Sequence, residues 1–146
     1  MVGVVLVTHG NLGPEMLSTA AEIVGGLEAS RSVSITPSDT PEQIREKMAA
    51  AIGEVDAGDG VLVLTDMFGG TPANVALSFL DERRVEVVTG VNLPMLVAPN
   101  FPSPGTARDG QATLWEIAQL ISGYGQKNIV FASDLLGSSR RAGARP

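Results

Sequence analysis

The chain has 146 residues, enough for one domain whose core buries about two-thirds of the surface that the unfolded chain exposes. It has no cysteine and a net charge of −6, which excludes disulfides, zinc–thiolate sites and thiol nucleophiles and argues against the basic footprint that nucleic-acid binding needs. The first apolar run is too short for a signal core or a transmembrane helix. We therefore expect a cytoplasmic protein without membrane insertion, with residues 1–136 as a single domain and residues 137–146 as a disordered tail.

Five short runs rich in apolar and β-branched residues predict strands. The runs at residues 2–7 and 61–64 are apolar throughout, as in central strands of a parallel sheet, whereas residues 32–36 alternate, which is typical of a strand nearer an edge. The remaining runs are residues 85–89 and 128–132. Amphipathic stretches separate the strands, so the pattern predicts an α/β fold, a doubly wound, mostly parallel β-sheet with helices on both faces. We expect the last strand to be antiparallel.

The starts of the predicted helices carry clear signals. The first helix opens at Pro14, where a missing amide donor costs nothing. Three later starts combine a capping threonine with a residue typical of a first turn: Thr40 with Gln43, Thr71 with Pro72, and Thr113 with Glu116. Residues 99–110 contain several prolines and glycines without periodicity and predict an exposed loop.

Two side chains stand out because each lies just beyond a predicted strand, separated from it by one threonine. His9, the one histidine of the chain, follows the first strand, and Asp66 follows the strand at residues 61–64. In open α/β sheets, ligands bind outside the carboxyl ends of the strands. Position alone leaves other readings open, since the His9 ring could be satisfied by a loop carbonyl and Asp66 could be a solvated acid or a helix cap.

Several familiar kinds of site are absent from the sequence. No GxxxxGK[ST] or GxGxxG motif follows a strand, and no GxSxG motif is present, which argues against nucleotide hydrolysis, dinucleotide redox chemistry and a serine hydrolase. His9, Asp66 and Glu15 could in principle share a cation, but most such sites recruit more ligands than the predicted strand ends offer. We therefore expect no metal and no other cofactor.

After these exclusions, the remaining candidate site is a histidine and an aspartate surrounded by backbone hydrogen-bond donors. If their strands are neighbours, the carboxylate of Asp66 can hold one imidazole N–H of His9 and leave the other ring nitrogen as a nucleophile. A phosphoryl group is a suitable target, because the glycine-rich loop after Asp66 and the start of the next helix can supply amide donors for its oxygens. The same glycines could instead form an ordinary tight turn. We assign phosphoryl binding to Phe68, Gly69, Gly70 and Thr71.

Three segments resemble one known family. They are THG at residues 8–10, TDMFGGTPAN at 65–74 and GVNLPML at 90–96. Together they resemble the mannose-type enzyme IIA domain of the bacterial phosphoenolpyruvate:sugar phosphotransferase system, over residues 1–98. The resemblance implies a doubly wound sheet, a homodimer joined by a late strand, phosphorylation of His9, and an orienting role for Asp66. It also implies that the histidine phosphocarrier protein donates the phosphoryl group and that a histidine of an enzyme IIB protein accepts it.

The resemblance leaves alternatives open. Transporting members of the family often carry a fused IIB domain, whereas this chain ends soon after residue 136. Sugar uptake and a regulatory role are therefore both compatible with the sequence. A module whose phosphorylation state is sensed by partners would use the same chemistry without a IIB acceptor. A small tetrapyrrole metal chelatase is a rival from another class, although such proteins use a second metal-binding histidine that this chain lacks.

Overall fold

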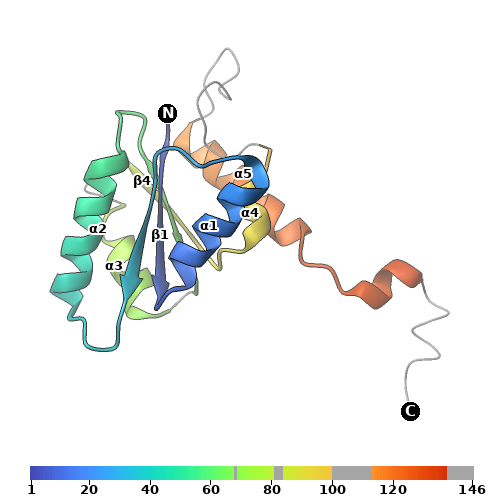
Figure 1. Cartoon of the computed structure of the whole chain (residues 1–146), viewed down its shortest axis with the longest axis horizontal. Coiled ribbons are helices and arrows are strands. Elements are labelled where there is room, and N and C mark those ends of the chain that lie inside the picture. The colour runs from blue at the N-terminus through green and yellow to red at the C-terminus, as the bar shows by residue number, and fades with distance from the viewer. Residues whose placement is uncertain (68, 81–83, 100–112, 138–146) are drawn as a thin grey trace.

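A four-stranded parallel β-sheet forms the centre of the protein, and helices cover both of its faces (Figure 1). This computed structural model describes residues 1–67, 69–80, 84–99 and 113–137. In chain order the elements are β1 (Gly3–His9), α1 (Leu12–Val24), β2 (Ser30–Ile35), α2 (Pro41–Val55), β3 (Val61–Thr65), α3 (Thr71–Leu77), β4 (Val85–Thr89), α4 (Leu93–Val97), α5 (Leu114–Lys127) and the 3-10 helix η1 (Ala132–Leu136).

The strand order is β2-β1-β3-β4, and every pair is parallel. The two apolar strands, β1 and β3, lie in the centre, and the alternating strand β2 lies at an edge, as predicted. Val7 of β1 pairs with Thr65 of β3. The carboxyl ends of these neighbouring strands therefore meet at one edge of the sheet, and this brings His9 and Asp66 together.

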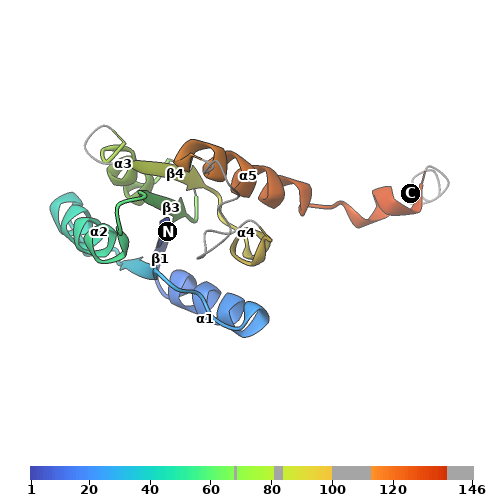
Figure 2. The same cartoon turned by 90° about the horizontal axis from the view of Figure 1, so that it is seen from above.

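Each face of the sheet has its own hydrophobic core, because successive strand residues point to opposite sides. Val5 and Val7 of β1 pack with α2 and α3, whereas Val4 and Leu6 pack with α1, α4 and α5. Figure 2 shows the two groups of helices on opposite sides of the sheet. The predicted α/β fold, a doubly wound parallel sheet, is confirmed.

Two of the three predicted threonine caps are confirmed. Thr40 and Thr113 both accept a hydrogen bond from the backbone three residues on, and both capping boxes are complete. Thr71 was wrongly predicted as a cap. It is the first residue of α3, Gly70 precedes it as the cap residue, and no side chain caps this helix. A side chain caps from the position before the first turn, which Thr71 does not occupy.

The predicted last strand, residues 128–132, is wrong for the single chain. α5 ends at Lys127, residues 129–131 form no regular structure, and a 3-10 helix begins at Ala132. Figure 1 shows that this segment projects away from the sheet. A strand needs a neighbour to pair its backbone groups, and the described residues place none beside this segment.

Some expectations concern parts of the chain that are not described. Residues 100–110 of the predicted loop and residues 138–146 of the predicted tail lie outside the described residues. Within the described ranges, no helix is both long enough and apolar enough to cross a membrane.

Candidate functional site

His9 is the last residue of β1, and the backbone on both sides of it is anchored. On one side, the buried hydroxyl of Thr8 accepts a hydrogen bond from the Gly13 amide at 2.7 Å, which fixes the start of α1. On the other side, the Gly10 amide donates to the Ile35 carbonyl of β2 at 2.9 Å. Gly10 has a φ of 55°, which glycine adopts without strain. The histidine is therefore held by the sheet itself.

Asp66 holds His9 through two hydrogen bonds to one carboxylate oxygen, one with the backbone and one with the ring. Its Oδ2 accepts from the His9 backbone amide at 2.9 Å and lies 2.9 Å from the His9 Nδ1. The His9 side chain is 52% exposed, whereas that of Asp66 is 11% exposed. The carboxylate is thus largely buried beneath a ring whose other side is open to solvent.

The charge on Asp66 sets the direction of the ring hydrogen bond. Burial raises the pKa of Asp66. The hydrogen bonds from the His9 amide and ring, together with the charge of the ring, lower it by more, so the pKa of Asp66 lies below its ordinary value. An ionised carboxylate only accepts hydrogen bonds, so Nδ1 of His9 must donate. In the neutral imidazole, Nε2 then carries the free lone pair.

Gly70 borders the open nitrogen of the ring. A Cβ added to Gly70 would lie 3.7 Å from Cε1 and 4.0 Å from Nε2 of His9, so the glycine keeps this space free of side-chain atoms. Gly69, with a φ of 87°, and Thr71 flank Gly70 in the chain. The structure therefore brings His9, Asp66 and Gly70 together, whereas no described contact joins Gly69 or Thr71 to the ring. Phe68 lies outside the described residues.

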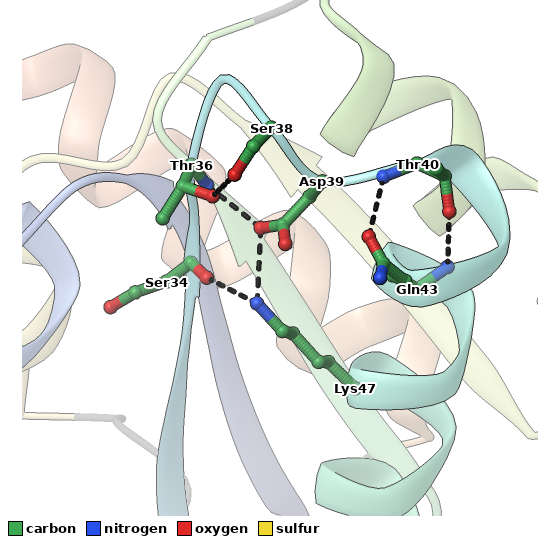
Figure 3. Close-up of polar contacts among 7 residues, drawn as sticks. All are labelled: Ser34, Thr36, Ser38, Asp39, Thr40, Gln43 and Lys47. Atoms are coloured by element: carbon green, nitrogen blue, oxygen red, sulfur yellow. Dashed lines mark hydrogen bonds and ion pairs between the residues drawn. The ribbon is translucent and has the colours of Figure 1, made fainter.

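The loop that follows β2, the strand paired with β1, holds a network of polar contacts that was not predicted from the sequence (Figure 3). Asp39 Oδ2 accepts from the Thr36 amide at 2.8 Å and from Lys47 Nζ at 3.0 Å. These two partners, the Thr36 amide first, lower the pKa of Asp39. The network fixes the chain just beyond Ile35, whose carbonyl holds Gly10. Thr8 was also missed, because its role depends on a contact with α1 that the sequence does not reveal.

The cation site considered from the sequence is not assembled. Among the described residues, no three histidine, aspartate or glutamate side chains form a group that could hold a metal, and His9, Asp66 and Glu15 all belong to that part of the chain. The chemistry that this edge offers is that of an oriented imidazole.

Comparison with known proteins gives the family. The family model EIIA-man, described as "PTS system fructose IIA component", matches residues 3–100. The chain belongs to the EIIA-man family. This confirms the resemblance seen in the sequence, because the matched range contains all three motifs, and it places His9, Asp66 and Gly70 within the EIIA-man region. Neither the site nor the relatives described next support the alternative of a tetrapyrrole chelatase.

Individual relatives agree with this assignment. The chain is 32% identical over 129 residues to the "PTS system mannose-specific EIIAB component" of Escherichia coli (strain K12), covering 88% of this chain and 38% of that protein. It is 31% identical over 98 residues to the "PTS system fructose-specific EIIA component" of Bacillus subtilis (strain 168), covering 66% of this chain and 67% of that protein.

A solved structure shows the same EIIA fold. The mannose/sorbose specific IIA subunit of the phosphotransferase system from Enterococcus faecalis has a TM-score of 0.75 and 31% identity, covering 88% of this chain and 92% of that one. The chain spans 38% of the length of the Escherichia coli relative, which is an EIIAB component.

Proposed function

We propose that this protein is a phosphoryl carrier in which Nε2 of His9 accepts a phosphoryl group from the histidine phosphocarrier protein and passes it to a histidine of an enzyme IIB protein. One observation carries the proposal: Nδ1 of His9 lies 2.9 Å from the buried carboxylate of Asp66, which leaves Nε2 as the exposed nucleophile. Such an orienting hydrogen bond fixes both the tautomer and the direction of a catalytic imidazole.

The transfer can be written with its atoms and electrons balanced. The Nε2 lone pair of His9 attacks the phosphorus of the phosphohistidine donor, and the donor's N–P bond breaks and returns its electron pair to the donor nitrogen. The proton on Nδ1 stays in place, so the phosphorylated ring gains positive character that the carboxylate of Asp66 stabilises. Transfer to the IIB histidine is the same step in reverse, and neither metal nor water takes part in it.

Backbone amides are the proposed ligands of the phosphoryl oxygens. The first amides of a helix have no carbonyl partner within it, so those at Gly70 and Thr71 are available where α3 begins beside the imidazole. We retain Gly69 and Phe68 as predicted members of this site. α3 has seven residues, so we attribute the stabilisation to individual amides rather than to a long helix dipole.

The reaction fits a cytoplasmic component of sugar uptake. The relatives are described as mannose-, fructose- and mannose/sorbose-specific, so their names support sugar transport in general without selecting one sugar. Regulation remains the second candidate role, with the same chemistry at His9 and no IIB acceptor.

We further propose a homodimer, because the two edges of the sheet differ. On the edge strand β2, the guanidinium of Arg31 bonds the Ser30 carbonyl at 2.9 Å and pairs with Glu54 at 2.9 Å, and charged side chains hinder further pairing at an edge. Lys47 also reaches the Ser34 carbonyl of this strand at 3.4 Å. In the described part of the chain β4 pairs with β3 alone, so its outer edge is the open one.

The segment after α5 is the element that fits this open edge. Ile129, Val130 and Phe131 are 76%, 54% and 71% exposed, which a monomer in water would not favour for three adjacent apolar residues. A groove of about 390 Å³ runs between β4 and α5, with Trp115 among its lining residues. We propose that the segment of a second copy pairs with β4 along this groove.

The single tryptophan provides the test of the dimer. Trp115 is 57% exposed in the single chain, so pairing beside it should shift its emission to shorter wavelength as protein concentration rises. Phe131→Asp should keep the emission of the exposed indole and give a monomer in analytical ultracentrifugation. A wild-type protein that is monomeric at micromolar concentration would contradict the proposal.

The carrier function is tested with phosphoenolpyruvate, enzyme I and the histidine phosphocarrier protein, followed by intact mass. The wild-type protein should gain one phosphoryl group, and His9→Ala should gain none while keeping its circular dichroism spectrum. The modification should be lost in acid and survive base, the reverse of a phosphoserine. An acid-stable phosphate, or one that persists in His9→Ala, would refute the assignment. A chelatase would remain unmodified and insert a metal into a tetrapyrrole.

A further inference from the structure

The loop after β4 is bonded directly to the strand that leads into the site. The carbonyl oxygen of Thr65 accepts hydrogen bonds from the amides of Gly90 and Val91, each at 2.9 Å. Thr65 is fully buried and immediately precedes Asp66. The Thr65 carbonyl belongs to the planar peptide group that also contains the Asp66 nitrogen, so the two hydrogen bonds from residues 90 and 91 restrict the orientation of the peptide that leads into Asp66.

Asn92 extends this connection to the last helix. Its Oδ1 accepts from the Met95 amide at 3.3 Å and so caps α4, while its Nδ2 donates to the Gly125 carbonyl of α5 at 3.0 Å. The side chain thus bonds two helices at once. Gly125 leaves little room at this contact, because an added Cβ would collide with the Met95 side chain and lie 3.2 Å from Asn92 Oδ1.

The carbonyl held by Asn92 lies in the turn from which the exposed segment departs. Gly125 O also accepts from the Asn128 amide at 3.3 Å, and the Ile129 amide donates to Gln126 at 3.2 Å. Beyond this turn come the exposed apolar residues 129–131. The direction in which that segment leaves the body therefore depends on the position of the last turn of α5.

We propose that residues 90–92 couple subunit assembly to the phosphoryl site, with Asn92 as the positioning residue that joins the two. This inference rests on the proposed function and on the proposed dimer. Pairing of residues 129–131 with a second copy fixes the last turn of α5, and Asn92 passes that constraint to Gly90, Val91 and the Thr65 carbonyl. Asp66 follows next in the chain and holds His9, so hydrogen bonds and short stretches of backbone connect the two sites.

Coupling of this kind has a thermodynamic signature. If assembly changes the free energy of phosphorylation, phosphorylation must change the free energy of dimer dissociation by the same total amount. Couplings between sites commonly amount to about fivefold or more in affinity. The dimer dissociation constant of the full chain should therefore differ at least about fivefold between the unmodified and phosphorylated forms.

The experiment compares the two dissociation constants by analytical ultracentrifugation in the wild type and in two variants. Asn92→Ser keeps a capping oxygen for α4 but has no donor that reaches Gly125. Asn128→Ala is the matched control, because it removes a hydrogen bond of 2.9 Å from its side chain to the Tyr124 carbonyl at the same helix end. It leaves residues 90–92 untouched. In Asn92→Ser we expect the dimer dissociation constants of the unmodified and phosphorylated forms to differ by less than about twofold. In Asn128→Ala they should differ by the same factor as in the wild type.

Two results would overturn the inference: equal dissociation constants for both wild-type forms, or a ratio in Asn92→Ser that matches the wild type. If Asn92→Ser does not fold, Asn92→Asp takes its place with the same expectation, since its carboxylate caps α4 but cannot donate to Gly125. Failure of the proposed function is seen separately. An unchanged intact mass would show that His9 accepts no phosphoryl group. A wild-type monomer would show that there is no dimer to couple. Either result would also overturn the inference.

Discussion

Replacement of Asp66 by asparagine tests the orienting role of the carboxylate. The change keeps the size of the side chain and an oxygen that can accept from the His9 amide. It removes the charge, so the remaining carbonyl oxygen holds the Nδ1–H of His9 more weakly and the tautomer with its proton on Nε2 becomes more populated. That tautomer has no lone pair at the proposed nucleophilic nitrogen, so phosphoryl transfer should slow.

The size of the effect follows from the 2.9 Å bond between Nδ1 and Oδ2. A hydrogen bond to a charged group contributes about 1.5–3 kcal/mol, and about 1.4 kcal/mol in the barrier changes a rate tenfold. Loss of this bond alone therefore slows transfer about 10- to 150-fold, and the wrong tautomer adds to the loss. We expect Asp66→Asn to transfer about 10²-fold more slowly than the wild type, or slower still.

The assay is rapid-quench mixing of the variant with phosphorylated phosphocarrier protein, read out by intact mass. Asp39→Asn is the matched control, because Asp39 is also 11% exposed and accepts from a backbone amide and a cationic side chain, but has no described contact with the imidazole. Its transfer rate should stay within about twofold of the wild type. Wild-type transfer by Asp66→Asn, or equal slowing in Asp39→Asn, would refute the reasoning.

Further predictions concern the space beside the ring, the packing of α5, acid stability and the end of the chain. Gly70→Ala should fold but accept the phosphoryl group more slowly in the same assay, because its methyl group occupies the space beside Nε2 of His9. Gly125→Ala should lower the free energy of unfolding by about 1–3 kcal/mol in urea titrations, since it overpacks against Met95. The lowered pKa of Asp66 stabilises the fold above the ordinary carboxyl pKa, and this contribution is lost as pH falls through the folded value. Thermal unfolding below about pH 4 should therefore depend less on pH in Asp66→Asn than in the wild type. Removal of residues 137–146 should leave folding and phosphoryl acceptance intact, which circular dichroism and intact mass would check.

The parts of the fold that the sequence predicted correctly rest on local patterns. The apolar runs of β1 and β3 marked them as central strands, and the capping boxes at Thr40 and Thr113 located two helix starts. The pairing of His9 with Asp66 was expected only if their strands are neighbours, and the adjacent strands β1 and β3 meet that condition. These inferences needed only short-range signals and one topological rule.

The parts that escaped prediction depend on contacts between distant residues. Asn92 and Gly125 are 33 positions apart, and nothing in their spacing shows that one bonds the other. The predicted strand at residues 128–132 has a strand-like composition, but composition does not say whether a neighbouring strand is available to it. Thr71 fits a capping pattern, yet the helix begins one residue earlier than that pattern requires.

The one-sided exposure of His9 has a consequence for the order of events. Asp66 occupies Nδ1, so the proposed donor and acceptor must reach the same nitrogen from the same open side of the imidazole. Two proteins cannot occupy that side together, so the donor has to leave before the acceptor arrives. A carrier built in this way follows ping-pong kinetics, in which double-reciprocal plots at different acceptor concentrations are parallel lines.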